Sequence, residues 1–408
     1  MRDCVVIGGG PAGSAAATVL GRAGRSVLVL EAARFPRFHV GESIVPAATS
    51  LWKSIGLWEK LQPTMFARKG GADFLIADGS REERFWFARY LDERFHRVLQ
   101  VDRAPFDTIA LAHARASGAE ALEGCRVTEV TFLEPGFEVT WKDEAGTTRT
   151  ERARSLLDCS GMKCLLGKKL GLRKLVPGTT KVALFAHYEN VKLPEGDRAG
   201  NTEVIAAEDA WYWMIPMTIE PGGRNTSSVG VVIDRTVRDA WRGEPLEMME
   251  RLFEASSVVR ERLAPAKRLS PAHVEADFSI FSTGFYLSQL HAVEAAESIA
   301  RALSKRDRVT GADLAKPARN HFQKIGTYTR FVRAFYTQPW YDIFLSDAKS
   351  PRVRKAVVRV LAGDVAGMNW YLWIFFAVLW AQKKWGIQPV VRRPRVTGAL
   401  EFPSTART

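Results

Sequence analysis

Cysteine and long apolar runs are both scarce in this chain of 408 residues. The four cysteines show neither zinc-ligand spacing nor a compact disulfide framework, so they fit a reducing cytoplasm. An apolar run at Trp370–Ala381 holds twelve residues, which is too short for a transmembrane helix. The first expected strand begins almost at Met1, so the sequence predicts no signal peptide and a cytoplasmic protein.

Acidic residues are outnumbered, because 45 Asp and Glu stand against 58 Lys and Arg and give a net charge of +13. This balance indicates an anionic partner, such as a phosphate-rich cofactor, an acidic protein or an anionic membrane surface. A solvated basic surface is the equally weighted alternative. No nucleic-acid recognition motif accompanies the charge, so we expect no nucleic-acid partner. The length allows two or three domains.

The stretch Asp3–Glu31 carries the strongest motif of the sequence. An apolar run at Cys4–Ile7 predicts a buried strand, and Gly8, Gly10 and Gly13 follow it in G-x-G-x-x-G spacing. An Ala-rich helix and a second apolar strand come next, expected at Pro11–Arg22 and Ser26–Leu30. The order of strand, glycines, helix, strand and acid predicts a dinucleotide-binding unit.

Each part of this unit has a physical task. Gly8 permits a tight turn, Gly10 lets a pyrophosphate approach bare backbone, and Gly13 lets the helix lie close to the strand. The helix N-terminus offers free N–H groups and a partial positive charge to the phosphates. Glu31 can accept hydrogen bonds from ribose hydroxyls. A glycine-rich turn without a ligand is the weaker alternative.

Polar candidates follow in the next segments. Glu42 and Ser43 lie in a loop that could fold back over the cofactor, although Ser43 is also a plausible helix N-cap. Lys69 precedes two glycines and could be a positioned amine, but taken alone it is more often a surface lysine. Arg103 stands where a strand enters a helix, which suits a phosphate contact or a surface cap. Asp158 ends another apolar strand in an Asp-x-Ser-Gly turn.

The hydrophobic pattern changes in the middle of the chain. Four segments between residues 181 and 233 alternate with a period of two and predict an antiparallel sheet, half buried on one face. Trp211 and Trp213 share one face of it, and from spacing alone we favour a core role over an aromatic pocket. One helix is expected from Glu244 to about Leu263. A further long helix, Tyr286 to Leu303, follows Phe281–Gly284, and its N-terminus is a second candidate anion site.

Taken in order, these motifs resemble those of flavin-dependent halogenases and related FAD monooxygenases and oxidoreductases, especially the branch acting on phenols, pyrroles and carrier-bound substrates. The resemblance covers nearly the whole chain. Its motifs are Gly8–Gly13 (GGGPAG), Gly41–Ser43 (GES), Lys69–Gly71 (KGG), Gln100–Asp107 (QVDRAPFD), Asp158–Gly161 (DCSG), Trp211–Pro216 (WYWMIP) and Phe281–Gly284 (FSTG).

The resemblance assigns roles to single residues. Lys69 matches the family's catalytic lysine, and Trp211 and Trp213 match its W-x-W-x-I-P signature. The backbone amides of Ser282, Thr283 and Gly284 are expected to hold the halide. The residues expected to bind FAD are Gly8, Gly10, Pro11, Ala12, Gly13, Glu31, Glu42, Ser43, Arg103, Asp158, Thr283 and Gly284.

The resemblance also implies a reaction. A separate reductase would supply reduced FAD, since no second G-x-G-x-x-G for a nicotinamide is visible. Reduced FAD, oxygen and halide would give hypohalous acid, which would pass to Lys69 and then to an electron-rich aromatic ring, either free or on an acyl or peptidyl carrier protein. Trp211 and Trp213 would wall the passage. A partly neutral Lys69 requires a lowered pKa, which desolvation would supply.

One departure from the family pattern leaves alternatives open. The family has a strand and a Gly-Asp segment just before F-S-T-G, whereas here Asp277–Ser279 runs directly into Ile280 and that turn. The segment appears deleted, and the similar letters at Leu361–Gly367 lie on the wrong side of the helix. The chain could therefore be a monooxygenase or a geranylgeranyl-reductase-like enzyme without halogenation, or a remnant with a weakened FAD site.

The predicted fold class is α/β: a Rossmann-like FAD-binding domain with a parallel sheet, an inserted antiparallel substrate domain and a helical C-terminal region. The FAD-binding domain is expected at 1–67, 98–177 and 277–329, the substrate domain at 68–97 and 178–276, and the helical region at 330–408. Within that region a buried helix at Trp370–Ala381 is favoured over an interfacial segment, so a peripheral membrane contact is the alternative.

Overall fold

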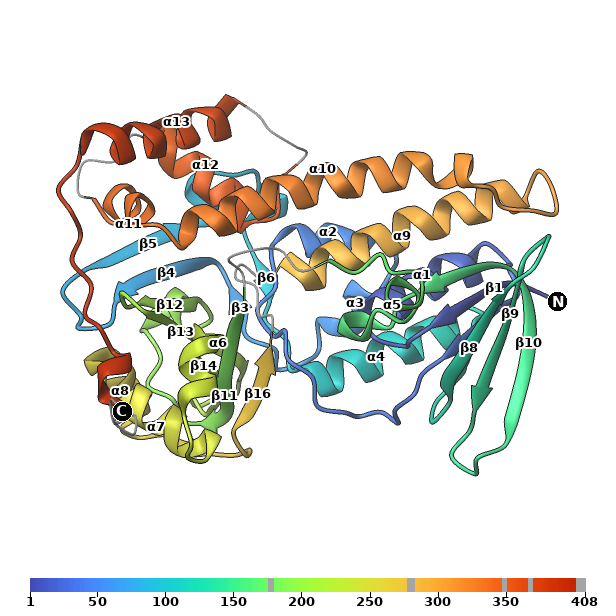
Figure 1. Cartoon of the computed structure of the whole chain (residues 1–408), viewed down its shortest axis with the longest axis horizontal. Coiled ribbons are helices and arrows are strands. Elements are labelled where there is room, and N and C mark those ends of the chain that lie inside the picture. The colour runs from blue at the N-terminus through green and yellow to red at the C-terminus, as the bar shows by residue number, and fades with distance from the viewer. Residues whose placement is uncertain (175–179, 277–282, 347–350, 366–369, 401–408) are drawn as a thin grey trace, which may run out of the picture.

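The computed structural model describes residues 1–174, 180–276, 283–346, 351–365 and 370–400. Two sheets lie at opposite ends of the molecule, and helices from the C-terminal third run along one side of both (Figure 1). This arrangement confirms the predicted class of a parallel-sheet unit, a second sheet and a helical C-terminal region.

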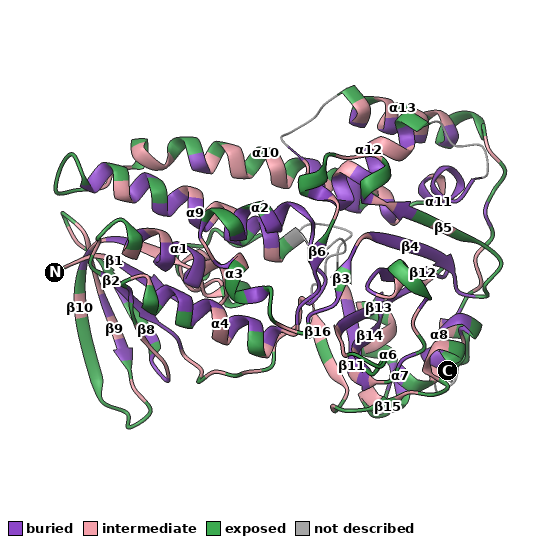
Figure 2. Ribbon diagram, turned by 180° about the vertical axis from the view of Figure 1, so that it is seen from behind, coloured by how far each residue is buried: buried purple, intermediate pink, exposed green. Residues whose placement is uncertain are grey.

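The first sheet has the strand order β7-β2-β1-β10-β9-β8. Strands β7, β2, β1 and β10 are parallel neighbours, and β9 and β8 add an antiparallel hairpin. In chain order the strands are β1 (Arg2–Ile7), β2 (Val27–Leu30), β7 (Glu120–Leu122), β8 (Arg126–Phe132), β9 (Phe137–Lys142) and β10 (Thr148–Asp158). The outer hairpin is largely exposed, whereas β1 and β2 are buried (Figure 2).

Helix α1 (Pro11–Arg22) packs between α4 (Arg103–Ala116) and α9 (Thr283–Leu303) against this sheet. The small side chains of its inner face, Ala16 and Ala17, are fully buried, so the helices approach closely. Helix α10 (Gly311–Phe335) continues along α9. Helix α9 begins three residues before the predicted Tyr286.

The second sheet follows the order β15-β11-β14-β13-β12-β4-β5, with β16 also pairing β11. Its strands are β4 (Gly71–Ile76), β5 (Glu82–Trp86), β11 (Lys181–Glu189), β12 (Thr202–Ala206), β13 (Ala210–Ile219), β14 (Asn225–Asp234), β15 (Lys267–Arg268) and β16 (His273–Ala276). The pairing is antiparallel as predicted except between β12 and β4, which are parallel. These two strands come from distant parts of the chain, so no hairpin fixes their relative direction.

The two faces of the second sheet bury different cores. Tyr212 and Met214 point to the face covered by α7 (Pro245–Glu254) and α8 (Ser257–Leu263), whereas Trp211 and Trp213 point to the face shared with the C-terminal helices. The single helix expected here is two helices. The first ends at Glu254, and Ser256 caps the second, because its Oγ accepts a hydrogen bond from the backbone N–H of Val259.

The remaining elements are short connectors and the C-terminal helices. Helix α13 lies at the outer edge of the molecule above α12 (Figure 1). The connectors are α2 (Ala47–Ser54), α3 (Trp58–Leu61), β3 (Arg68–Lys69), β6 (Val98–Leu99), α5 (Leu165–Lys169) and α6 (Arg235–Ala240), and the last helices are α11 (Gln338–Phe344), α12 (Pro351–Leu361) and α13 (Trp370–Trp385). Within the described ranges, no helix combines the length and the hydropathy that crossing a membrane requires.

Candidate active site

The glycine turn after β1 is shaped by two close backbone contacts. Gly8 has φ +98°, and a Cβ there would lie 2.5 Å from the carbonyl oxygen of Cys159. A Cβ on Gly13 would lie 1.9 Å from the carbonyl oxygen of Gly8, closer than real Cβ contacts occur. Only glycine fits either position, which brings the N-terminus of α1 against the end of β1.

The N-terminus of α1 is left open to a ligand. Gly10 is its N-cap and provides no side-chain hydrogen bond, and Pro11 begins the helix without an N–H, whereas α4 is capped by the Asp102 carboxylate. The next N–H groups, of Ala12 and Gly13, have no partner within the helix. Backbone donors and the helix dipole therefore favour a phosphate at this position.

Arg37 supplies a cation beside this helix end. Its Nη2 lies 3.4 Å from where a Cβ on Gly10 would stand, and its buried Nη1 has no hydrogen-bond partner among the described residues. An unpaired buried guanidinium nitrogen is costly unless a ligand accepts from it. These residues therefore fit the pyrophosphate of a dinucleotide. Sequence reasoning did not single out Arg37, since its only signal was its place in the basic loop before Gly41–Ser43.

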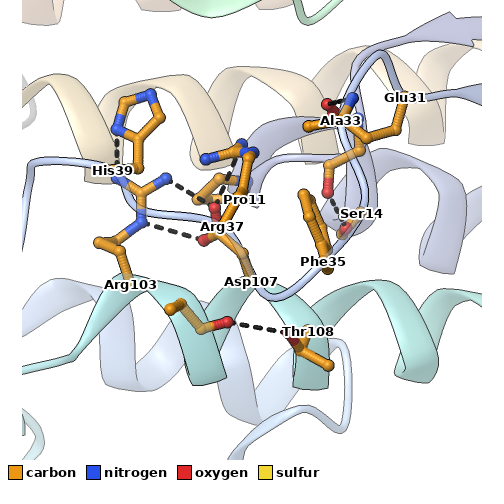
Figure 3. Close-up of polar contacts among 12 residues, drawn as sticks. Pro11, Ser14, Glu31, Ala33, Phe35, Arg37, His39, Arg103, Asp107 and Thr108 are labelled. Atoms are coloured by element: carbon orange, nitrogen blue, oxygen red, sulfur yellow. Dashed lines mark hydrogen bonds and ion pairs between the residues drawn. The ribbon is translucent and has the colours of Figure 1, made fainter. Parts of the chain in front are cut away.

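Arg103 is held by Asp107 (Figure 3), and its contact with the cofactor stays a prediction. Its Nε and Nη2 each donate to the Asp107 carboxylate at 2.9 Å, and Nη1 donates to the carbonyl oxygen of Val40 at 2.6 Å. Arg37 reaches the same carboxylate, with Nη2 at 3.3 Å from Oδ2. Burial, followed by the charge of Arg103, lowers the pKa of His39, which lies beside this pair. One buried carboxylate thus positions two guanidinium groups.

The two predicted acids at strand ends both bind backbone N–H groups. Glu31 is buried after β2, and its carboxylate accepts from Gly9 at 2.7 Å and from Ala33 at 2.8 Å. Asp158 ends β10 and accepts from Ser160 and Leu166, which fixes the turn into α5. The structure places Glu31 beside the glycine turn, while Asp158 acts on its own loop; their roles toward a cofactor stay predictions.

Lys69 is buried, in contrast to the surface lysine that its local sequence favours. Its Nζ donates to Ser43 Oγ at 2.9 Å and to the carbonyl oxygen of Ile44 at 3.2 Å. Burial lowers the pKa of the amine from its ordinary value to about 7. In the described part of the chain no carboxylate pairs with it. A substantial fraction of this amine is therefore neutral near pH 7.

A hydrogen-bond network fixes the lysine's acceptors. Ser43 Oγ lies 2.9 Å from Thr202 Oγ1, which accepts from Gln100 Nε2 at 2.7 Å. Gln100 Oε1 in turn accepts from the N–H of Ile44 at 3.2 Å. The site thus joins the Gly41–Ser43 loop, β3, the strand before α4 and β12. Gln100 and Thr202 escaped sequence reasoning, although Gln100 begins one of the family motifs.

Trp211 and Trp213 lie on the same sheet face as this network. Thr202 is two residues before Val204, which stands opposite Trp213 in the strand register. The indole centroids are 5.8 Å apart, Trp211 Nε1 donates to Tyr336 Oη and Trp213 Nε1 donates to Ser228 Oγ. Both rings are buried and packed, so in the described residues they form a wall of the core and not an open passage.

The Gly41–Ser43 loop also reaches the sheet through Glu42. Its buried carboxylate lies 3.3 Å from His187 Nε2 on β11 and accepts from the N–H of Gly41. Phe38 stacks on His273 with centroids 3.8 Å apart. Glu42 and Ser43 therefore clamp the loop onto the second sheet, in addition to whatever role they have toward a cofactor.

The predicted halide turn is only partly described. Thr283 begins α9, and Gly284 is exposed with open space where a Cβ would stand. Ser282 and the stretch with the apparent deletion, 277–282, lie outside the described residues. The halide site and the deletion stay predictions.

Two adjoining clefts lie on the outer side of β3. The larger, about 640 Å³, is lined by Arg68 and Gly70, and the smaller, about 340 Å³, shares Arg68, His96 and Arg97 with it. Lys69 lines neither. Alternate residues of a strand face opposite sides, so the amine points inward, away from these clefts.

Comparison with known proteins identifies the family. The chain belongs to the FAD binding domain family, whose model matches residues 1–264, and FAD is its cofactor. It is 28% identical to a chlorinase of 1H-pyrrole-2-carbonyl peptidyl-carrier protein from Pseudomonas fluorescens, over 89% of each chain. A tryptophan 2-halogenase from Chondromyces crocatus is 29% identical over 69% of this chain and 54% of its own.

Solved structures agree with this placement. The flavin-dependent brominase Bmp2 superposes with a TM-score of 0.80 at 25% identity, covering 94% of this chain and 99% of its own. The myxobacterial chondrochloren halogenase CndH gives 0.77 at 26% identity, covering 89% of this chain and 90% of its own. The predicted resemblance to flavin-dependent halogenases, the fold class and the cofactor are confirmed, and the chain is an FAD-dependent oxidoreductase homologous to those halogenases.

Proposed function

We propose that this enzyme halogenates an electron-rich aromatic substrate, and that Lys69 carries the halogen to the ring. The observation that supports this most directly is the buried amine, whose pKa is lowered to about 7 and whose acceptors are Ser43 Oγ and the carbonyl oxygen of Ile44. The two relatives named above are halogenases, and so is a 27% identical brominase of 1H-pyrrole-2-carbonyl peptidyl-carrier protein from Pseudoalteromonas luteoviolacea.

The chain's own residues divide the work. Bound FAD, once reduced by a separate reductase, supplies with oxygen the oxidising equivalents that turn halide into hypohalous acid. The α1 N-terminus and Arg37 would hold the cofactor's pyrophosphate and Glu31 its ribose. Asp107 positions the guanidinium of Arg37. The amides of Ser282, Thr283 and Gly284 remain the proposed halide site.

Lys69 then acts as nucleophile. The lone pair of its neutral amine attacks the halogen of hypohalous acid, the N–halogen bond forms as the O–halogen bond breaks, and the leaving hydroxide takes an amine proton to become water. A ring carbon next attacks this halogen, the N–halogen bond breaks, and the ring proton returns to Nζ. The packed indoles of Trp211 and Trp213 exclude water from this face and keep the amine desolvated.

The test compares Lys69→Ala with Lys53→Ala, a control at an exposed lysine. Each protein is supplied with reductase, oxygen, bromide or chloride and an electron-rich phenol or pyrrole, and products are weighed by mass spectrometry. Lys69→Ala should abolish the halogenated product while flavin oxidation continues at the wild-type rate. Unchanged halogenation would overturn the role of Lys69. A wild-type product that gains oxygen or two hydrogens would instead identify a monooxygenase or a reductase.

We also propose that the aromatic substrate arrives on an acidic carrier protein. The net charge of +13 and the carrier-bound pyrroles of two relatives support this. Association with a carrier protein should weaken as salt rises, because such attraction is screened. Halogenation of free substrate with no salt-dependent binding to any carrier would remove this part of the proposal and leave the rest standing.

A further inference from the structure

Helix α13 lies on the outside of the molecule (Figure 1), and several of its tryptophans are exposed; we call these the tryptophan stripe. Trp370, Trp373 and Trp380 are 67%, 61% and 54% exposed, and Trp385 at the end of the helix is 62% exposed. The first three stand at helical spacings of three and seven, so they share one face. Large apolar side chains gathered on one exposed helix face mark an interaction surface.

The opposite face of the same helix is committed to the fold. Leu372, Phe375 and Leu379 are buried, and the ring of Phe375 packs against Trp340 with centroids 5.3 Å apart. This inner face explains why the sequence favoured a buried helix, which is correct for one side only. Because these inner side chains hold the helix against the rest of the protein, the tryptophan stripe faces outward.

The charged side chains of α13 itself are all basic. Helix α13 contains no acidic residue, and Lys383 and Lys384 lie in its last turn. Lys384 Nζ lies 5.1 Å and 5.5 Å from the ring centroids of Trp380 and Trp385. Across the described ranges neither lysine forms an ion pair. Lys355 of α12 adds a third cation, 5.3 Å from the ring of Tyr371.

We propose that α13 docks this enzyme onto an anionic lipid surface, lying flat in the headgroup layer. Indole rings prefer that layer because one side of it is apolar and the other is wet, and lysines beside them attract anionic headgroups. The helix has 16 residues, about 24 Å at 1.5 Å per residue, which is shorter than the roughly 30 Å hydrocarbon core. It therefore lies on the membrane and does not cross it.

The charge pattern favours lipid over a second copy of the chain. A symmetric contact through the stripe would bring Lys383 and Lys384 of one copy close to the same lysines of the other. Helix α13 has no acidic residue that could form an ion pair with them. An anionic bilayer offers an interfacial layer for the indoles and negative headgroups for the lysines. This inference goes beyond the proposed reaction and needs no substrate, halide or reductase.

Sedimentation of the FAD-loaded enzyme with vesicles tests the proposal. The enzyme should pellet with vesicles of phosphatidylcholine mixed with phosphatidylglycerol and far less with phosphatidylcholine alone, and salt should release it. Trp373→Ser with Trp380→Ser, and separately Lys383→Glu with Lys384→Glu, should each weaken binding by about tenfold.

Matched controls lie elsewhere on the surface. Phe322→Ser removes a 73% exposed ring from α10, and Arg126→Glu with Lys142→Glu reverses two exposed charges on the distant β8–β9 hairpin. Both should leave vesicle binding within about twofold of wild type. Circular dichroism and flavin content show that each variant is folded.

Three outcomes would overturn the proposal. The first is no binding to anionic vesicles. The second is binding that the α13 variants and the controls change equally. The third is a failure to bind vesicles together with self-association, or complex formation with an acidic carrier protein, in sedimentation velocity. If the α13 variants abolish that association, the stripe binds a protein partner.

Discussion

The glycine turn at the end of β1 and the amine of Lys69 are built in opposite ways. The turn comes from neighbouring residues, Gly8 to Gly13, and works through backbone geometry. The amine depends on Ser43, Gln100 and Thr202, which reach it from separate segments. Local backbone motifs can be recognised along the chain, whereas a network of side chains exists only after folding.

The two regions also handle charge differently. Around the turn, Asp107 balances Arg37 and Arg103. Around Lys69, no carboxylate among the described residues offsets the cost of burying the amine, and burial lowers its pKa to about 7. Substitutions in the first region should therefore cost stability and flavin, while substitutions in the second should cost reaction and leave flavin bound.

The largest effect is expected where a counter-charge is removed. Asp107→Asn leaves the buried guanidinium of Arg103 and the partly buried one of Arg37 without this carboxylate, and should destabilise the fold by about 3–5 kcal/mol in urea unfolding, with loss of bound flavin. Glu220→Gln breaks an exposed pair with Arg224 and should change stability by less than about 0.5 kcal/mol. Equal effects of the two variants would mean that Asp107 has no such role.

Lys69→Met should raise the free energy of unfolding, whereas Asp107→Asn lowers it. A buried lysine with a lowered pKa binds fewer protons when folded, so its penalty is full below about pH 7 and fades as pH rises toward the ordinary value near 10.5. The methionine variant should therefore be more stable than wild type by a few kcal/mol at pH 6, by less at pH 9, and inactive in halogenation. A stability difference that is independent of pH would contradict the assigned pKa.

A smaller effect is expected at the glycine turn. Gly13→Ala places a Cβ against the carbonyl oxygen of Gly8 and should cost about 1–3 kcal/mol and release flavin, read from the visible absorbance of the purified protein. Gly326→Ala, in open space on α10, should instead stabilise by up to about 1 kcal/mol. Retention of full flavin by Gly13→Ala would show that the close approach is unnecessary.

The smallest change sharpens the comparison within the amine site. Thr202→Val keeps the shape but removes the hydroxyl that contacts Ser43 and Gln100, and should cost about 1 kcal/mol. Flavin content should stay at the wild-type level while halogenation falls and its pH profile shifts, because the acceptors of Lys69 lose their anchor. A loss of flavin equal to that of Gly13→Ala would contradict the claim that the glycine turn binds flavin while the Lys69 site serves the reaction.

Much of the fold followed from pattern. The apolar runs and glycines predicted β1, α1 and β2, and the alternation predicted the second sheet, because these signals are local. The break at Ser256 was missed, since the cap depends on a short-range bond that competes with helix propensity. Helix α13 was read as buried because composition cannot tell which side of an apolar helix meets a neighbour.

The site was harder to predict from the residues themselves. Lys69 was identified through the family motif and not through spacing, which favoured a surface lysine. Arg37 was missed because its distinguishing property, an unpaired buried nitrogen, arises only in the fold. Arg103 was predicted to contact the cofactor, which stays a prediction, whereas its pairing with Asp107 was not foreseen.

The most direct test is the titration of the Lys69 amine itself. Lysine labelled with carbon-13 at Cε is followed by NMR against pH in the FAD-loaded enzyme, with the Lys69 signal assigned by its absence in Lys69→Ala. We expect a midpoint near pH 7 for this lysine. A Lys69 midpoint near 10.5 would show an amine that stays charged, and would contradict the mechanism.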